Sequence, residues 1–376
     1  MSNPVENVEN VKDNTAGTHS LAEILSQPEC WKRCLDDLDR SQKLEEVRDR
    51  FTGADWLFVG CGSSYYVALS AAATMTMLTG RRAQAIPASE ILLAPEFVLS
   101  SFKHVAPVLI SRSGRTSEVL RAAELLKSRG VPTLAITCAT QQALEPLATA
   151  TIVLPAADEK STVMTRSFSS MLLTLQQLAA TVAGDSKSSE SLHALPAAAA
   201  PVLQPLVGQI RKFVDDHDFA DYVYLAQGPL YGLACEGALK VMEMSVSYAQ
   251  AFHTLEFRHG PKSIVSRETL LVFLLSETGY EEEVAVLEEM KSLGATTLAI
   301  VNCSDARARA AADLLVELNL EVPELARLAP YVFAEQLLGL FTGLKKGLDP
   351  DSPRNLSRVV ILDDGNSRKR REDAAF

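Results

Sequence analysis

The chain contains an internal duplication, and this feature limits its possible folds more than any other. Residues 105–138 read VAPVLISRSGRTSEVLRAAELLKSRGVPTLAITC, and residues 270–303 read LLVFLLSETGYEEEVAVLEEMKSLGATTLAIVNC. Ser111 recurs as Ser276 at an offset of 165 residues. Further upstream, WLFVGCGSSYYVAL resembles YVYLAQGPLYGLAC at an offset of 166. Matches at nearly one offset indicate two related structural units.

Each copy alternates short apolar runs with amphipathic helical patterns. Such runs are typical of strands buried on both faces of a parallel sheet. In the first half they are Trp56–Val59, Val105–Ile110, Pro132–Ile136 and Thr151–Leu154. We therefore predict an α/β fold of two tandem, doubly wound, flavodoxin-like domains with parallel sheets.

The predicted organisation follows from this alternation. Pro28 is expected to open or interrupt a helix near the start of the chain. The stretch Gly184–Pro205, which is rich in Ser, Ala and Pro, is expected to join the halves and to be partly helical. A long helix near Leu325–Lys346 is expected to close the second half. The expected segments are a disordered leader (1–18), N-terminal helices (19–50), a first domain (51–187), a second domain (206–347) and a C-terminal tail (348–376).

Composition narrows the class of protein. Of the 376 residues, 47% are hydrophobic and 22% are charged, which suits a globular chain with large cores. No uncharged apolar run is long enough to span a membrane, and the polar leader lacks the features of a signal peptide, so we expect a cytoplasmic protein. The net charge of −11 argues against nucleic-acid binding. The basic cluster Arg368–Arg371 is interpreted as a solvated tail, because acidic residues follow it at once.

The six cysteines are scattered along the chain, at positions 30, 34, 61, 138, 235 and 303. None forms a C-x-x-C pair, and no histidine lies near the first two. We expect free thiols, no metal site and no cofactor.

Two loops rich in hydroxyl groups follow predicted strands of the first half. Gly60–Tyr65 reads GCGSSY, with Ser63 and Ser64, and Ser111–Thr116 reads SRSGRT. Their glycines let backbone N–H groups point at an anion, and each loop leads into a helix N-terminus. Ser111, Arg112, Ser113 and Thr116 add side-chain donors, so both loops are predicted to bind phosphate, although Ser and Thr also cap helices without any ligand.

A dinucleotide-binding loop is the rival interpretation of the first motif. The pattern G-x-G-x-x-G would need a glycine where Tyr65 stands, and no acidic residue clearly ends the next strand. The second copy offers an internal comparison, since its matching turn is followed by Glu281–Glu283 and also contains Glu277. Four carboxylates would repel phosphate, so only the first half is expected to hold one.

Candidate acid–base groups lie in the second half. Lys240 and Glu243 are three residues apart on a predicted helix and share a face, within the sequence EGALKVME. A surface ion pair is one interpretation, but the apolar neighbours favour partial burial. His259 follows in FRHGPKS. A partly buried carboxylate and a histidine are candidates for general acid–base catalysis.

These motifs, with the terminal PRNLSRVV, resemble the sugar isomerase (SIS) domain family over about residues 20–362. They are most similar to the isomerase half of glucosamine-6-phosphate synthase and to the galactosamine-6-phosphate deaminase/isomerases, also called tagatose-6-phosphate ketose/aldose isomerases. The resemblance implies a homodimer that binds a hexosamine 6-phosphate or related phosphosugar. Positions that match the family would contact the substrate: Ser64, Ser111, Arg112, Ser113 and Thr116, with Val163–Thr165 lining the sugar.

The resemblance also implies roles in catalysis. Glu243 would move the proton between C1 and C2, with Lys240 beside it, and His259, supplied by the partner subunit, would assist ring opening. The synthase carries an additional glutaminase domain, for which this chain, which begins Met1-Ser2, has no room. The synthase also has a lysine at the position of Arg358. We expect Arg358 to contact the substrate, but arginine cannot form an imine with a ketose.

We therefore expect an aldose–ketose isomerase that deaminates a 6-phosphorylated amino sugar. Simple isomerisation of a phosphosugar, cleavage of a glycated amine, and a synthase-like isomerase without the glutaminase are the alternatives within enzymes. A non-catalytic sugar-phosphate sensor that binds a partner protein is the alternative from another class, because a fold alone does not decide function.

Overall fold

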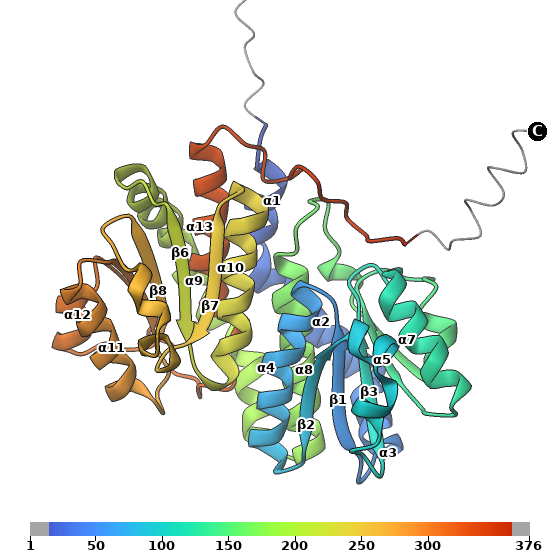
Figure 1. The fold of residues 1–376 in the computed structure, drawn as a ribbon. Coiled ribbons are helices and arrows are strands. Elements are labelled where there is room, and N and C mark those ends of the chain that lie inside the picture. The colour runs from blue at the N-terminus through green and yellow to red at the C-terminus, as the bar shows by residue number, and fades with distance from the viewer. Residues whose placement is uncertain (1–14, 363–376) are drawn as a thin grey trace, which may run out of the picture.

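The computed structural model describes residues 15–362, so most of the predicted leader and the basic cluster Arg368–Arg371 lie outside the described residues. Two five-stranded parallel sheets lie side by side (Figure 1). Their strand orders are β2-β1-β3-β4-β5 and β10-β9-β8-β6-β7. The strands are β1 (Asp55–Gly60), β2 (Ala83–Pro87), β3 (Val105–Ile110), β4 (Leu134–Thr137), β5 (Ala150–Val153), β6 (Asp221–Ala226), β7 (Tyr248–His253), β8 (Thr269–Leu274), β9 (Thr296–Val301) and β10 (Leu314–Glu317).

The predicted class of fold is confirmed, and the first order is the doubly wound, flavodoxin-like one. The four apolar runs of the first half form β1, β3, β4 and β5. Strand β2 was not predicted, because it lies at the sheet edge and its sequence AQAIP is only half buried. An edge strand lacks the continuous apolar pattern that marks a central one.

The helices cover both faces of the sheets. They are α1 (Thr18–Leu25), α2 (Gln27–Ser41), α3 (Lys43–Arg50), α4 (Ser63–Thr79), α5 (Ala88–Leu93), α6 (Pro95–Leu99), α7 (Ser117–Ser128), α8 (Arg166–Ala183), α9 (Ser186–Asp216), α10 (Tyr231–Ser245), α11 (Tyr280–Ser292), α12 (Ala306–Ala311) and α13 (Val332–Lys345). Pro28 lies in the first turn of α2, where proline needs no N–H partner.

The stretch between the halves is more regular than its composition indicates. Gly184–Pro205 was expected to be a connection with some helix, but almost all of it belongs to the 31-residue helix α9. The carboxylate of Asp185 accepts the Ser188 N–H at 3.0 Å and caps its first turn. Three prolines lie inside the helix, which buries an apolar face that includes Leu192, Leu195 and Ala199. Burial of that face outweighs the helix-breaking composition.

One hydrophobic core joins the two halves. It combines the inner faces of both sheets with helices from each half, while smaller clusters lie on the outer face of each sheet. Trp31 on α2 stacks on Phe333 on α13, with ring centroids 5.3 Å apart. The Trp31 indole N–H also donates to the Ser169 hydroxyl at 2.8 Å. Among residues 15–362, no helix is long and apolar enough to cross a membrane.

Candidate active site

The two hydroxyl-rich loops meet at one edge of the first sheet. Strands β1 and β3 are neighbours, and their carboxyl ends open into a cavity of about 230 Å³. This edge is the switch point of the doubly wound order, where ligands bind in such sheets. The first loop lines the cavity with Cys61–Ser64, and the second with Arg112, Ser113 and Thr116.

Glycine shapes the first loop. Gly62, which precedes α4, has φ 55° and ψ −128°, a conformation that residues with a Cβ rarely adopt. A Cβ added to Gly60 would lie 2.5 Å from the backbone of Ser64. The strand end can therefore approach the start of α4 only without a side chain at position 60, and this approach brings the helix N-terminus to the cavity.

The hydroxyl groups of the loops differ in what they contact. The Ser111 and Thr116 hydroxyls lie 3.1 Å apart, and the Ser113 hydroxyl accepts the Arg115 N–H at 3.2 Å. Ser111 is almost fully buried and is not among the cavity-lining residues. The Ser63 hydroxyl points to the second half, where it donates to Glu236 at 3.0 Å. Ser64, Ser113 and Thr116 are thus the hydroxyl side chains of these loops best placed for a ligand.

Arg112 holds several segments around the cavity together. Its guanidinium lies 3.2 Å from the Glu159 carboxylate and is 6% exposed. It also donates to the carbonyl oxygens of Thr162, Val163 and Arg358 at 2.8, 3.1 and 3.0 Å. The guanidinium of Arg112 is thus engaged with protein groups. Arg112 lines the cavity and acts as a clamp, because its contacts hold together segments that are distant in sequence.

The segment after Glu159 lines the cavity through different residues from those predicted. Val163 and Thr165 are buried, and the Thr165 hydroxyl donates to the Glu159 carboxylate at 2.8 Å. Thr162 and Met164 line the cavity instead. The predicted segment therefore reaches the cavity, but the side chains that line it are those of its neighbours, since the alternation of the backbone was not visible in the sequence.

The helix α10 brings ionisable groups to the opposite wall. Glu243 lines the cavity, with 18% of its side chain exposed, and Lys240 is fully buried. The Lys240 ammonium contacts Glu243 and lies 3.2 Å from Glu236, which is also buried. The predicted pair is thus part of a triad in which Lys240 and Glu236 are buried and Glu243 reaches the cavity. No role was predicted for Glu236, although its spacing of four residues from Lys240 places both side chains on the same face of the helix.

Burial and charge act against each other within this triad. Burial raises the pKa of the Glu236 carboxyl group to about 7, although Lys240 acts in the opposite direction. Burial by itself would lower the pKa of Lys240, but the attraction of Glu236 and Glu243 outweighs it and raises that pKa. Lys240 therefore stays charged, and its ammonium fixes the Glu243 carboxylate at the cavity wall.

The chain after α13 returns to the first half and closes one side of the cavity. In Figure 1 this red segment runs from α13 toward α7. Leu356–Val360 line the cavity, and the Val360 carbonyl accepts the Ser117 N–H at 3.2 Å. The Arg358 side chain forms an ion pair with Asp158. Arg358 therefore lies at the cavity as predicted, with its guanidinium directed to a carboxylate of the protein.

His259 does not reach the cavity within this chain. It is exposed and follows the 3₁₀ helix η4 (Glu256–Arg258), beyond the edge strand β7. Large hydrophobic side chains of β7 and of the segment that follows it are exposed as well, with Tyr248 at 62% and Ile264 at 44%. Of the three predicted acid–base residues, the single chain brings together Glu243 and Lys240.

In the second copy of the loop, a carboxylate of the protein itself, that of Glu283, accepts hydrogen bonds from the loop. The Glu283 carboxylate accepts the Ser276 N–H at 2.6 Å and the Ser276 hydroxyl at 3.1 Å. Burial raises the pKa of Glu283 to about 7, although the Ser276 donors act in the opposite direction. An internal carboxylate thus takes the donors that a phosphate would need, and Glu277, Glu281 and other acidic side chains line the adjoining cavity.

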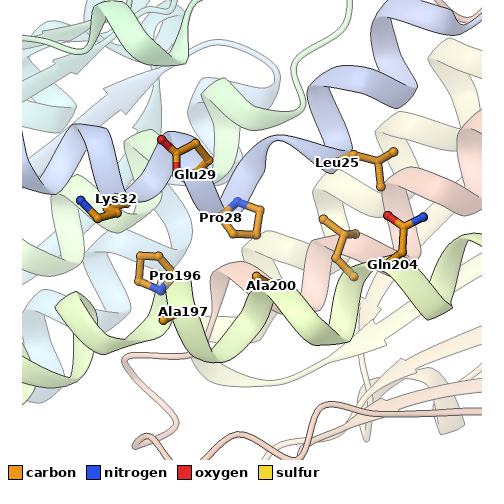
Figure 2. A pocket seen from close by; sticks show the side chains of 9 residues that line it. Leu25, Pro28, Glu29, Lys32, Pro196, Ala197, Ala200 and Gln204 are labelled. Carbon is orange, nitrogen blue, oxygen red and sulfur yellow. The ribbon is translucent and has the colours of Figure 1, made fainter.

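Other cavities lack this combination of groups. The surface groove between α2 and α9 has a volume of about 320 Å³, with Pro28 and Pro196 on opposite walls (Figure 2). Its ionisable lining residues are Glu29 and Lys32 alone. Within residues 15–362, no group of three or more His, Cys, Asp or Glu side chains is arranged to hold a metal ion.

The comparisons with known proteins agree with the fold. The SIS domain model matches residues 55–181 and 221–338. Glucosamine-6-phosphate deaminase from Thermotoga maritima is 30% identical, with a TM-score of 0.73, over 92% of this chain and all of that one. Tagatose-6-phosphate ketose/aldose isomerase from Escherichia coli shares the fold, with a TM-score of 0.80 at 24% identity over 93% of this chain and 97% of that one.

A longer relative matches as well. The isomerizing glutamine–fructose-6-phosphate aminotransferase from Pyrobaculum aerophilum is 28% identical over 91% of this chain. The chain spans 57% of the length of that protein. The family model covers both halves of the duplication, and the relatives align over nearly the whole chain. The chain therefore belongs to the SIS domain family.

Proposed function

We propose that the protein is a sugar-phosphate isomerase that deaminates a 6-phosphorylated amino sugar. One observation carries the proposal: the Glu243 carboxylate, held by the buried Lys240 ammonium, lines the same cavity as the hydroxyl-rich loops. Hydroxyl-rich loops that can bind an anion, with a fixed carboxylate on the facing wall, suit a substrate that has a phosphate at one end and an acidic C–H bond at the other.

Phosphate recognition rests on local donors, because the protein as a whole is negatively charged. The N-termini of α4 and α7 lie at the cavity edge and carry partial positive charge. The hydroxyls of Ser64, Ser113 and Thr116 line the same space. We assign the phosphate to this edge and the sugar chain to the path toward Glu243.

The proposed reaction begins with the open-chain aldose. Glu243 removes the C2 proton while O1 takes up a proton from water, which gives an enolamine with a hydroxyl group on C1. Return of the proton from Glu243 to C1, with loss of one N–H proton to water, yields a CH₂OH group and an imine at C2. Water then adds to the imine carbon and ammonia leaves, which gives the ketose 6-phosphate. A single carboxylate can serve both proton transfers, since C1 and C2 are adjacent.

We further propose a homodimer in which the partner subunit supplies His259 for ring opening. The exposed hydrophobic side chains of β7 and of the segment after it, among them Tyr248 and Ile264, support this arrangement, because contact with a partner subunit would remove them from water. The names of the relatives support phosphosugar chemistry. They include both a deaminase and an isomerizing aminotransferase.

The arrangement at Arg358 favours release of ammonia over chemistry through a protein-bound imine. Arginine stays protonated and cannot act as an amine nucleophile, and its side chain is paired with Asp158. Simple isomerisation of a phosphosugar would use the same Glu243 chemistry and would yield no ammonia. A sensor without catalysis would bind the phosphosugar and leave it unchanged.

The test is incubation with a panel of hexosamine 6-phosphates and hexose 6-phosphates, with ammonia and ketose measured in the same samples. We expect equal amounts of ammonia and ketose from one amino sugar phosphate. Glu243→Gln should lower kcat by about 10²–10⁴-fold and leave phosphosugar binding nearly unchanged. Glu45→Gln, at an exposed position on α3, is the matched control. Wild-type turnover by the Glu243→Gln variant would refute the assignment of the base.

A further inference from the structure

A buried carboxyl group lies behind the triad. Glu335 on α13 is 1% exposed, and neither of its carboxyl oxygens has a hydrogen-bond partner among the described residues. A buried charge without a partner is costly, and most buried polar groups in proteins are satisfied. The other buried side chains of α13 are apolar except for those of Gln336 and Thr342. A carboxyl group at this position therefore needs a reason beyond packing.

Two further polar atoms without partners surround the same point on α10. Glu335 and Tyr224 both pack against Gly237 of α10. A Cβ at that position would lie 2.7 Å from a Glu335 oxygen and 2.5 Å from the ring of Tyr224. The Tyr224 hydroxyl on β6 is buried and has no partner. The second carboxyl oxygen of Glu236, the residue before Gly237, has none either. Groups without partners on α13, β6 and α10 thus lie around Gly237, and Glu335 and Glu236 are close enough to repel each other.

Burial and the surrounding charges determine whether the Glu335 carboxyl group is protonated or ionised. Burial, followed by repulsion from Glu236, raises the pKa of Glu335 well above its usual value. The other titratable groups that act on Glu335 or Glu236 are Tyr224 and Cys235, together with Lys240, Glu243 and Tyr66. Only Lys240 among them is a cation, and its ammonium lies at the other oxygen of Glu236. Glu335 is therefore the neutral acid of the pair.

A neutral carboxyl group carries one O–H donor, and the open oxygen of Glu236 is an acceptor at the same buried place. We propose that Glu335 is a positioning residue that donates this hydrogen bond to Glu236, after a side-chain rotation or through one water molecule. Glu236 then remains the anionic partner of Lys240, and Lys240 holds Glu243 at the cavity. The effect on turnover rests on the proposed function, whereas the protonated state of Glu335 does not.

The first test detects the proton on the Glu335 carboxyl group and needs no substrate. Infrared spectroscopy of the full chain in D₂O at neutral pH should show the C=O stretching band of a buried protonated carboxyl group. Glu335→Gln should lower the intensity of that band, to which Glu236 and Glu283, with pKa values of about 7, also contribute at neutral pH. Glu45→Gln, at the exposed position on α3, should leave it unchanged. A spectrum in which wild type and Glu335→Gln have the same protonated-carboxyl band would overturn the proposal.

The second test separates donation from packing. The amide of Glu335→Gln keeps a neutral donor of similar shape, so its kcat should stay within about threefold of wild type and its pH profile unchanged. Glu335→Leu keeps the apolar volume and removes the donor. Its kcat should fall about tenfold, with the acidic limb of the pH profile moved to higher pH and KM unchanged.

The outcomes are distinct. Equal losses in Glu335→Gln and Glu335→Leu, or no loss in Glu335→Leu, would overturn the positioning role. Both variants are first compared with wild type by thermal unfolding. If Glu335→Leu does not fold, the infrared band and the profile of Glu335→Gln still decide the matter. If wild type turns over no phosphosugar, the proposed function fails, while the infrared test still decides whether Glu335 carries the proton.

Discussion

Replacing Arg112 by Met should destabilise the protein by about 3–5 kcal/mol, because Arg112 is the cation that neutralises Glu159 in the interior. The Glu159 side chain is fully buried and the Arg112 side chain is 6% exposed, so water cannot compensate for the lost partner. The three carbonyl oxygens that the guanidinium contacts would also lose a donor. Methionine keeps the apolar stem, and the expected loss is therefore one of charge and hydrogen bonds.

Urea unfolding followed by circular dichroism gives the free energy of unfolding, and a fluorescence titration with the phosphosugar gives its Kd. The matched control is Arg115→Met, in the same loop at an exposed position, which should change stability by less than about 0.5 kcal/mol. If Arg112→Met is as stable as this control and only its Kd rises, then Arg112 binds the ligand directly, and the interpretation of Arg112 as a clamp is wrong.

Two further substitutions test the loops of the two halves. Gly60→Ala should displace the start of α4, because its Cβ would lie 2.5 Å from the Ser64 backbone, and phosphosugar affinity should fall at least about tenfold. Gly208→Ala in the middle of α9, where a Cβ meets nothing within 4 Å, should instead stabilise the protein by about 0.5–1 kcal/mol; equal affinity in both variants would contradict the argument. Glu283 has a folded-state pKa of about 7 against an ordinary 4.5, so the folded protein retains its proton longer and stability should fall as pH rises through that window. Glu283→Gln should reduce this loss by up to about 3 kcal/mol when urea unfolding is compared at pH 5 and pH 8, and an unchanged pH dependence would show that Glu283 is not its source.

The sequence predicted the features that depend on local pattern. Continuous apolar runs between amphipathic helices predicted parallel sheets, because only strands covered on both faces lose their polar alternation. The duplication predicted two such sheets, and comparison of its copies led to the prediction that phosphate binds at the loops of the first half. The edge strand β2 and the long helix α9 were not predicted in full, since partial burial and tertiary packing decide them.

The sequence also predicted which segments would carry the chemistry, but not how their side chains are used. The spacing of Lys240 and Glu243 was enough to place them on one face of a helix. That Arg112 pairs with Glu159, or that Glu335 packs against Gly237 and is repelled by Glu236, depends on residues brought together from distant positions. Such contacts follow from the packing of strands and helices against one another, and local sequence carries no record of that packing. The sequence by itself thus determined the fold class and the segments that meet at the cavity, whereas the tertiary structure decided which groups are paired, buried or open to a ligand.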